Sequence, residues 1–525
     1  MTRIVALIVL AQFLCVRSNL VSSTKKVVET STVPNNGFST DEIVEKTKIV
    51  FNTSDSNVYL EDVLYAIRSQ EWSEDEMPCL NRTLVLLKNL QNFTLWSVWR
   101  SGVIKAFDIR SNLSSMMKSS DELHVLYGIK FMSMCVVVIG HQIGMFNSGP
   151  ISNGVNMDED STSFLGLLFL HDDSVVDSFF MLSGFLTATA ITKMKNLPNP
   201  LVMIFKRYMR LVIPYALMIF YVVAIFPYTG TGPLWNRAVA GETAQCKQNW
   251  WLNLLMVSNY VDTENVCIII SWYIPSDFHF FVFSLFLWEL YRRSPALGKV
   301  LVGVITVVSV ILPGVSTYMN DFPPIHAFNF EFISNPRGSK QFNELYIKSH
   351  MRYSAYVIGF VAGYVYVRPA LIDHLKRLSQ TWLTTIAYIS TVSIFACMYL
   401  GSVLYWRDNA AVVNAMYAAL NRPLWALGLA IIVLCCSVGH IPYIKAILSW
   451  YPWVPLSRLS YGVYLIHSML ITRNVFITRN LQFHDVVLLA TSCAGIVFWS
   501  HLAALLMWLV AEAPINNLVT LMLKQ

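Results

Sequence analysis

The sequence predicts an all-α polytopic membrane protein, with about ten transmembrane helices and a short lumenal amino-terminal region. Of its 525 residues, 55% are hydrophobic and only 13% are charged, and the mean hydropathy is +0.50. Soluble domains carry about 25% charged residues, so this chain has too few to cover an aqueous surface. Apolar runs close to the ~20 residues that cross a bilayer recur after residue 124, separated by short polar loops.

The expected spans follow from these runs. They lie at residues 125–146, 174–193, 208–228, 272–291, 297–317, 351–367, 383–403, 414–437, 459–477 and 485–510.

The residues before the first span have a different composition. They include the acidic stretch Ser73-Glu74-Asp75-Glu76 and no run long enough to span. Arg3 precedes an apolar stretch, residues 4–16, and Val16 and Ser18 have the spacing of a cleavage site. This pattern is typical of a secretory signal peptide at residues 1–18, with an uncleaved signal anchor as the alternative. Residues 19–104 would then form a lumenal region.

Sequons for N-glycosylation support lumenal exposure of this region. They begin at Asn52, Asn81, Asn92 and Asn112, and no sequon follows the first span. The alternative is that Asn and Ser are simply frequent in a polar segment.

The positions of Lys and Arg predict the orientation of the bundle. By the positive-inside bias, the loops after the second, fourth, sixth and eighth spans are cytoplasmic, as is the tail at residues 516–525. Their basic residues are Lys193, Lys195, Lys206, Arg207 and Arg210; Arg292, Arg293 and Lys299; Arg368, Lys376 and Arg377; and Lys445 and Arg458.

This orientation conflicts with a cleaved signal peptide, because one crossing is then missing. Three explanations remain open. The start is an anchor with its amino end outside, or the chain lacks a helix that a longer relative has before residue 105, or the whole bundle is inverted.

Two of the nine cysteines, Cys246 and Cys267, share one non-cytoplasmic loop. An oxidising compartment would let them form a disulfide, although two cysteines could share a loop by chance. Cys79 then has no partner that the sequence identifies.

Ionisable residues in the first span and at the start of the third mark candidate sites. Lys130 and His141 are eleven residues apart, which puts them on one face of a helix, about 16 Å apart along its axis. Such residues usually line a cavity, but Lys130 could snorkel to the interface and His141 could make a structural hydrogen bond. Arg207 and Arg210 are one turn apart and could bind phosphate, or they could anchor the helix at the interface.

These residues resemble the motifs of the acyltransferase-3 family of membrane acyltransferases. The family pattern is Arg or Lys, ten residues and then His, followed by Phe-x-x-Ser-Gly and by Arg-x-x-Arg. Lys130 with His141, then Phe180 with Ser183 and Gly184, and then Arg207 with Arg210 fit it in order.

The animal branch of nose resistant to fluoxetine-like proteins is similar over residues 105–515. The similar stretches are residues 121–134, 246–251, 271–277 and 459–467. Relatives of this branch have a longer cysteine-bearing lumenal domain and then an extra helix. Here residues 77–99 resemble only the beginning of that domain, which would explain the missing crossing.

The resemblance implies acyl transfer from a cytoplasmic acyl-CoA to a hydroxyl acceptor. His141 would be the general base, Lys130, Arg207 and Arg210 would bind phosphates of the donor, and Ser183 would contact substrate or a neighbouring helix. Asp277 and His467 are further candidates for substrate binding. The alternative is a carrier of lipids or small amphiphiles, or an inactive relative.

The sequence also limits the cofactors and partners. It contains no metal-binding spacing, and its net charge of +6 is spread over loops, which gives no support for nucleic-acid binding. Membrane lipids are the expected partners, and the acceptor is unknown. A signal peptide places the protein in the secretory pathway, in the endoplasmic reticulum or plasma membrane.

Overall fold

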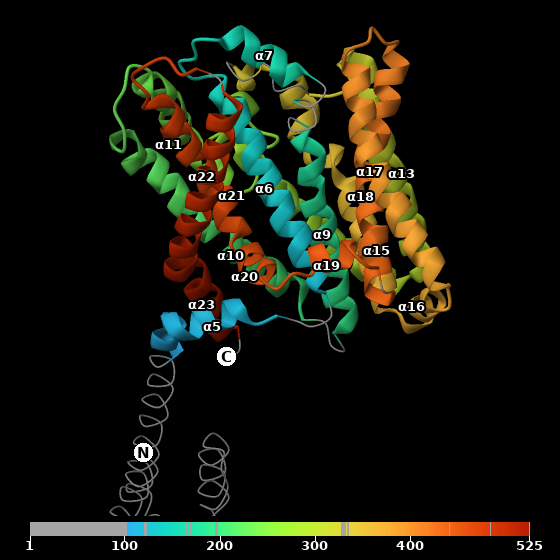
Figure 1. Ribbon diagram of the computed structural model, residues 1–525. Coiled ribbons are helices and arrows are strands. Elements are labelled where there is room, and N and C mark those ends of the chain that lie inside the picture. The colour runs from blue at the N-terminus through green and yellow to red at the C-terminus, as the bar shows by residue number, and fades with distance from the viewer. Residues whose placement is uncertain are drawn as a thin grey trace, which may run out of the picture. The chain divides into compact units, whose positions relative to one another are not determined.

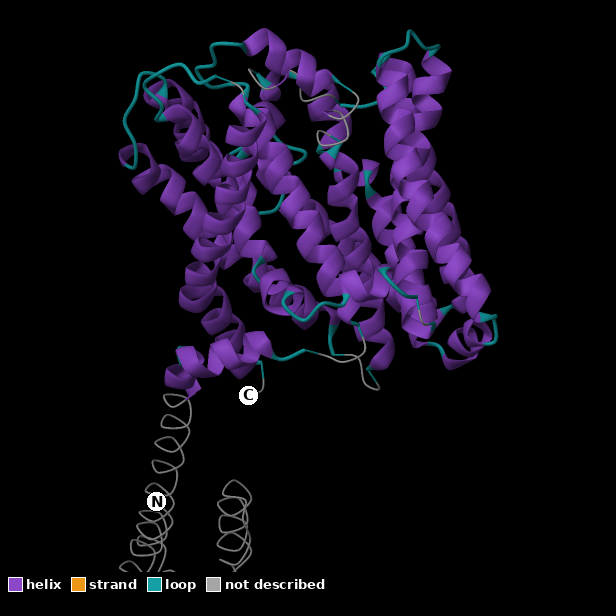
Figure 2. Ribbon diagram, in the orientation of Figure 1, coloured by secondary structure: helices purple, strands orange, loops and turns teal. Residues whose placement is uncertain are grey.

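The computed structural model describes residues 102–119, 123–163, 166, 171–194, 198–326, 332, 335–439, 441–483 and 485–523. The chain divides into two units, Met1–Lys105 and Ala106–Gln525, and the elements below belong to the second. Three predicted features lie outside the described residues. They are the signal peptide at residues 1–18, most of the lumenal region at residues 19–101, and the sequons at Asn52, Asn81 and Asn92. The described elements are helices (Figure 2), with one isolated β-bridge between Ile151 and Gln482.

Eight helical segments of the described chain are long and apolar enough to cross a membrane. They are α6 (His124–Phe146), α9 (Asp172–Lys193), α10 (Pro200–Phe220) with its extensions η1 (Tyr221–Ile225) and η2 (Phe226–Tyr228), α12 (Tyr273–Arg293) preceded by η4 (Ile269–Trp272), α13 (Pro295–Asn320), α17 (Gln380–Tyr405), α18 (Ala411–Val438), and α22 (Val486–Met507) continued by η8 (Trp508–Glu512) and α23 (Ala513–Met522).

Two further predicted spans are short helices. α15 (Tyr353–Val367) is followed by α16 (Pro369–Lys376) at an angle of 85°, and the two together could make a ninth span. α21 (Ser460–Phe476) has 17 residues. The all-helical membrane fold is therefore confirmed, and the number of crossings stays a prediction.

Several shorter or more polar elements were not predicted. α11 (Trp235–Leu254) was missed because Arg237, Glu242 and Lys247 interrupt any apolar run. The others are α5 (Ile109–Met117), α7 (Gly154–Thr162), α19 (Ile444–Leu448), α20 (Trp453–Arg458), η3 (Thr263–Asn265), η5 (Pro336–Gly338), η6 (Phe342–Tyr346) and η7 (Ser349–Met351).

Polar side chains before three helices explain where those helices begin. Asn199 Oδ1 accepts a hydrogen bond from the amide of Leu201 at 2.9 Å, and Pro200 occupies the first turn of α10. Ser379 begins α17 and Asp485 begins α22 in the same way. Each cap satisfies an amide that has no partner within its helix.

Small residues let α9 pack closely against α15. A Cβ atom at Gly359 would collide with the carbonyl oxygen of Met181, and one at Gly363 would collide with that of Phe185. Gly184 faces the carbonyl of Tyr356 from the other helix. Gly184 therefore lets the two helices approach closely, and this contact fixes the position of its neighbour Ser183.

A disulfide joins Cys246 of α11 to Cys267, as predicted. The side-chain amide of Asn253 donates to the carbonyl of Cys267 at 2.6 Å and to Ser271 Oγ at 3.1 Å, and it also contacts the hydroxyl of Tyr215 on α10. These bonds hold the segment that leads into α12.

The two ends of the bundle can be told apart by their short helices. Figure 1 shows α5, α16, α19 and α20 at one end and α7 at the other. α6 begins near α5 and ends near α7, so Lys130 lies toward the first end and His141 toward the second.

One predicted glycosylation site is corrected by its surroundings. The side chain of Asn112 is 3% exposed. Its amide donates to the carbonyl of Ala106 at 3.0 Å, and its oxygen accepts from Asn517 of α23 at 3.0 Å. A glycan needs an accessible amide, so this sequon is a structural asparagine. α23 also covers most of the predicted tail at residues 516–525.

Candidate functional site

Two histidines from helices far apart in the sequence meet inside the bundle. His141 lies near the end of α6, and His467 lies in the middle of α21. Nδ1 of His141 is 2.8 Å from Nε2 of His467, and the two rings are inclined by only 7°, with centroids 5.1 Å apart. His467 is fully buried and His141 is partly buried. The sequence predicted both residues as site residues but gave no sign that they touch.

The carbonyl oxygen of Val463 determines where the protons lie in this pair. Nδ1 of His467 is 2.9 Å from that oxygen. Because a carbonyl only accepts, this Nδ1 carries a proton, and Nε2 of the neutral ring is an acceptor. Nδ1 of His141 therefore donates to His467, and the lone pair of His141 is on Nε2. A neutral His141 in this tautomer can take a proton at Nε2.

A charged cluster lies toward the α5 end of the bundle. Lys130 interacts electrostatically with Arg210, Glu512 and Asp277. Glu512, 3% exposed at the end of η8, interacts with Arg210 as well. Glu512 was not predicted as a site residue, although an acidic residue directly after the last apolar run is a signal that could have found it. The side chain of Arg210 is exposed, so a phosphate could reach it.

Three predicted substrate-binding residues instead bind one another. Arg207 Nη2 lies 2.6 Å from Asp277 Oδ2 and donates to Ser183 Oγ at 2.7 Å. Ser183 in turn donates to Asp277 Oδ1 at 2.6 Å. The guanidinium also lies over the ring of Phe281, 4.4 Å from its centroid. This closed triad ties α9, α10 and α12 together, which is a different role from the phosphate contact predicted for Arg207.

A second buried charge network joins α9 to α15 and α18 near the α7 end. Asp177 and Arg352 are both fully buried, and Oδ1 of Asp177 is 3.2 Å from Nη1 of Arg352. Arg422 lies 3.5 Å from Asp177 and 3.7 Å from Asp173, and Asp173 is also 2.9 Å from His171. Two carboxylates balance two guanidinium groups, so the network can stay charged within the bundle. It was not predicted, because its members come from spans separated by long stretches of sequence.

No group of three or more His, Cys, Asp or Glu side chains in the described ranges is placed to hold a metal ion.

The comparisons with known proteins identify the family. Residues 124–506 match the acyltransferase-3 family, described as an acyltransferase domain. The chain belongs to the acyltransferase-3 family. This agrees with the resemblance noted in the sequence, and the matched region runs from the first residue of α6 almost to the end of α22.

Two relatives from Caenorhabditis elegans are similar over most of the chain. The nose resistant to fluoxetine protein 6 is 24% identical over 442 residues, which is 79% of this chain and 53% of the relative. The regulator of hypoxia-inducible factor 1 is 21% identical over 441 residues, 78% of this chain and 83% of the relative. The chain thus spans about half the length of the first relative. No solved structure matches it.

Within this acyltransferase-3 domain, the family motifs fall at two kinds of place. His141 belongs to the histidine pair, which can accept a proton. Lys130 and Arg210 belong to the charged cluster, which can bind an anion. Ser183 and Arg207 belong to the closed triad, where they join helices.

Proposed function

We propose that this membrane acyltransferase-like protein moves an acyl group from a cytoplasmic acyl-CoA to the hydroxyl of an acceptor. The observation that carries the proposal is the histidine pair, which gives His141 a defined proton-accepting nitrogen. The distance between the charged cluster and the histidine pair supports it further, because Lys130 and His141 are about 16 Å apart along one helix and a long donor could extend from one to the other.

The α5 end of the bundle would face the cytoplasm. α16, α19 and α20 lie at this end in Figure 1 and carry Lys376, Lys445 and Arg458. Lys and Arg are enriched in the cytoplasmic loops of membrane proteins. A donor from the cytoplasm would then meet the charged cluster first.

The donor would be bound through its phosphates. Lys130 and Arg210 supply two cations against the single carboxylate of Glu512, which leaves a positive charge for the diphosphate of acyl-CoA. The long pantetheine arm would then extend along α6 and bring the thioester to His141. Arg207 is not among the proposed phosphate ligands, because Asp277 already neutralises it.

The transfer step uses the lone pair on His141 Nε2. The acceptor oxygen attacks the thioester carbonyl as its proton passes to Nε2, and the C–O bond forms. The tetrahedral intermediate then expels the CoA thiolate, and the protonated imidazole returns its proton to that sulfur. His467 holds the ring of His141 and keeps the proton on Nδ1, so it acts as a positioning residue.

The acceptor would approach from the α7 end or from the bilayer, since His141 lies toward that end of α6. The acceptor would be a hydroxyl compound, and the lipids of the surrounding membrane are the expected partners. Passage through the secretory pathway, to the endoplasmic reticulum or plasma membrane, is part of the same proposal.

The experiment that tests this function uses the full chain in lipid nanodiscs. Labelled acyl-CoA is added with sets of lipid and carbohydrate hydroxyl acceptors, and free CoA and acylated product are measured. We expect acceptor-dependent release of CoA, lowered about 10²- to 10⁴-fold in His141→Ala, as is typical for loss of a general base. His374→Ala, in the exposed α16, is the control. Absence of turnover with every acceptor would favour a carrier or an inactive relative.

A further inference from the structure

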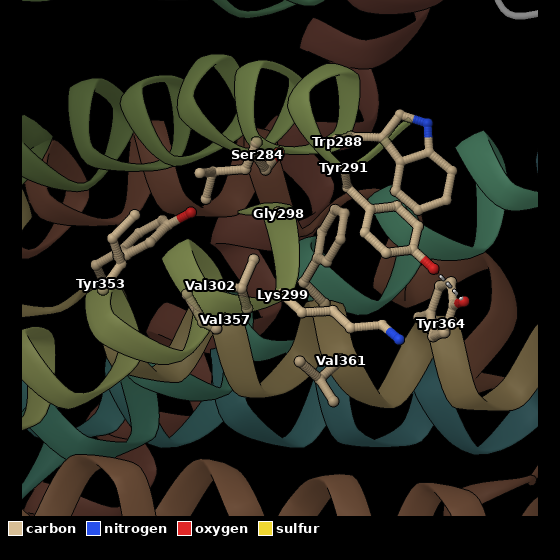
Figure 3. Close-up of a pocket in the computed structure, with 13 residues that line it drawn as sticks. Ser284, Trp288, Tyr291, Gly298, Lys299, Val302, Tyr353, Val357, Val361 and Tyr364 are labelled. Carbon is tan, nitrogen blue, oxygen red and sulfur yellow. Dashed lines mark hydrogen bonds between the residues drawn. The ribbon is translucent and has the colours of Figure 1, made fainter. Parts of the chain in front are cut away.

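A cavity of about 240 Å³ lies between α12, α13 and α15, away from the histidine pair. Its walls are almost entirely apolar and include Leu287, Val302, Ile305, Val357, Phe360 and Val361. Figure 3 shows the cavity with its lining side chains. α13 is the most exposed of the candidate spans, with 22% of its apolar window buried, so the cavity lies behind a helix that faces lipid.

The length of the cavity corresponds to one leaflet of a bilayer. Tyr353 and Tyr364 line its two ends and are eleven residues apart on α15. Eleven residues of helix rise about 16 Å. The hydrocarbon core of a bilayer is about 30 Å thick, so the cavity extends from one interface to roughly the midplane.

The interfacial end of the cavity carries polar and cationic groups. The hydroxyls of Tyr291 and Tyr364 are 3.0 Å apart, and Figure 3 shows the ammonium of Lys299 at the same end. The guanidinium of Arg368 lies 4.8 Å from the centroid of the Tyr364 ring. Among the described residues, Lys299 makes no ion pair with a carboxylate, so its charge is available to a ligand. Both cations are exposed.

The deep end of the cavity is lined by apolar and hydroxyl-bearing side chains, and no charged side chain is among its lining residues. Ser284 Oγ is 3.3 Å from the hydroxyl of Tyr356, which donates to Thr187 of α9 at 3.2 Å. An acyl chain that fills the cavity would pack against the apolar side chains of α12 and α15 and end next to these hydroxyls.

We propose that this cavity binds one acyl chain of an anionic phospholipid from the leaflet on the α16 side, with the lipid phosphate held by Lys299 and Arg368. The apolar walls, the length of one leaflet and the two cations at the interface each match one part of such a lipid. The site is separate from the histidine pair, so this inference does not depend on acyl transfer.

The test uses a phospholipid with a photoactivatable diazirine at the end of one acyl chain, added to the full-length protein in nanodiscs. Two head groups are compared, phosphatidylserine and phosphatidylcholine, and labelled peptides are located by mass spectrometry. We expect labels on α12, α13 and α15 and a preference for phosphatidylserine. Lys299→Gln should reduce that preference about fivefold, the effect of one cation near a membrane surface, whereas Lys376→Gln in α16 should not.

A matched pair of variants tests the cavity itself. Val302→Trp fills it, while Val304→Trp places the same ring on the exposed face of α13, where Val304 is 52% exposed. We expect only Val302→Trp to remove the labels. Labels spread over exposed helix faces and unchanged by Val302→Trp would overturn the proposal. Labels removed by acyl-CoA with no head-group preference would also overturn it, since the cavity would then hold the donor chain. If Val302→Trp does not fold, the Lys299→Gln result decides, because that side chain is exposed.

Discussion

His141 donates a hydrogen bond to His467 because His467 uses its own Nδ1 proton on the carbonyl of Val463. This chain of two bonds leaves one definite proton-accepting nitrogen, Nε2 of His141. The first prediction tests whether that orientation matters.

Replacing His467 should lower the turnover rate more than it weakens substrate binding. His467→Ala removes the acceptor for His141 Nδ1, so the ring can rotate or change tautomer, and we expect kcat to fall about 10- to 100-fold, less than the loss for His141 itself. His467→Gln offers an amide oxygen in place of Nε2 and should recover part of the rate. Steady-state kinetics on the purified variants measure both parameters. A rise in KM with unchanged kcat would instead make His467 a substrate ligand.

The second prediction separates the two arginines of one motif. Arg207→Ala leaves the carboxylate of Asp277 buried without its partner, so the free energy of unfolding should fall by about 3 kcal/mol. Arg210→Ala removes an exposed cation, and Lys130 still lies beside Glu512, so stability should change much less while KM for acyl-CoA rises. Thermal unfolding in detergent and donor titrations distinguish them.

A double variant provides the control for the triad. Arg207→Met with Asp277→Leu replaces the ion pair by apolar side chains and should recover most of the lost stability, because a buried pair is often no better than a packed apolar one. If Arg207→Ala is as stable as the parent protein and only donor binding suffers, the triad is not structural and the phosphate role predicted from the sequence is restored.

The two arginines illustrate what the sequence could and could not predict. Hydropathy identified the all-helical membrane fold, because a span of about 20 apolar residues has few alternatives. Motif spacing singled out His141 and Arg207 as candidate site residues, and Asp277 was a further candidate for substrate binding. It could not tell a ligand from a structural partner, because Arg207 meets Asp277 only once α10 packs against α12.

The elements that were missed have physical reasons of their own. α11 is a polar helix, so no hydropathy signal marks it, and the sequence indicated only its disulfide cysteine and the similar stretch at residues 246–251. Arg352 and Arg422 lie in long loops or apolar spans, and their two aspartates are on another helix. Such a network becomes visible only in three dimensions.

The third prediction concerns orientation. An epitope tag inserted at Leu378, between α16 and α17, should be reached by antibody from the cytosol in selectively permeabilised cells. A tag at Gly230, between η2 and α11, should be protected under the same conditions. The reason is that basic residues cluster at the α16 end of the bundle. The reverse pattern would place the donor cluster on the wrong side for cytoplasmic acyl-CoA.

The fourth prediction concerns the disulfide, which closes a loop with a sequence separation of 21. Replacing Cys246 and Cys267 together by Ser should lower the free energy of unfolding by about 3 kcal/mol, since the open loop has more freedom in the unfolded chain. Cys135→Ala, a free cysteine on α6, should have a much smaller effect. Equal midpoints for the double variant and the parent in denaturant would contradict this role.

The last prediction tests the close contact between α9 and α15. Gly359→Ala puts a Cβ atom into the carbonyl oxygen of Met181, which belongs to helix backbone and cannot rotate away. The two helices must separate, so we expect a loss of at least about 2 kcal/mol in stability. Gly303→Ala on α13 is the matched control, because no atom beyond its chain neighbours and its own helix backbone lies within 4 Å of the position that its new methyl group would occupy. Alanine also favours a helix over glycine by about 0.5–1 kcal/mol. The separation of α9 would also move Ser183, so Arg207 should lose its hydrogen bond and acyl transfer should fall together with stability. A stable Gly359→Ala protein with full activity would show that α9 and α15 are not held at this distance.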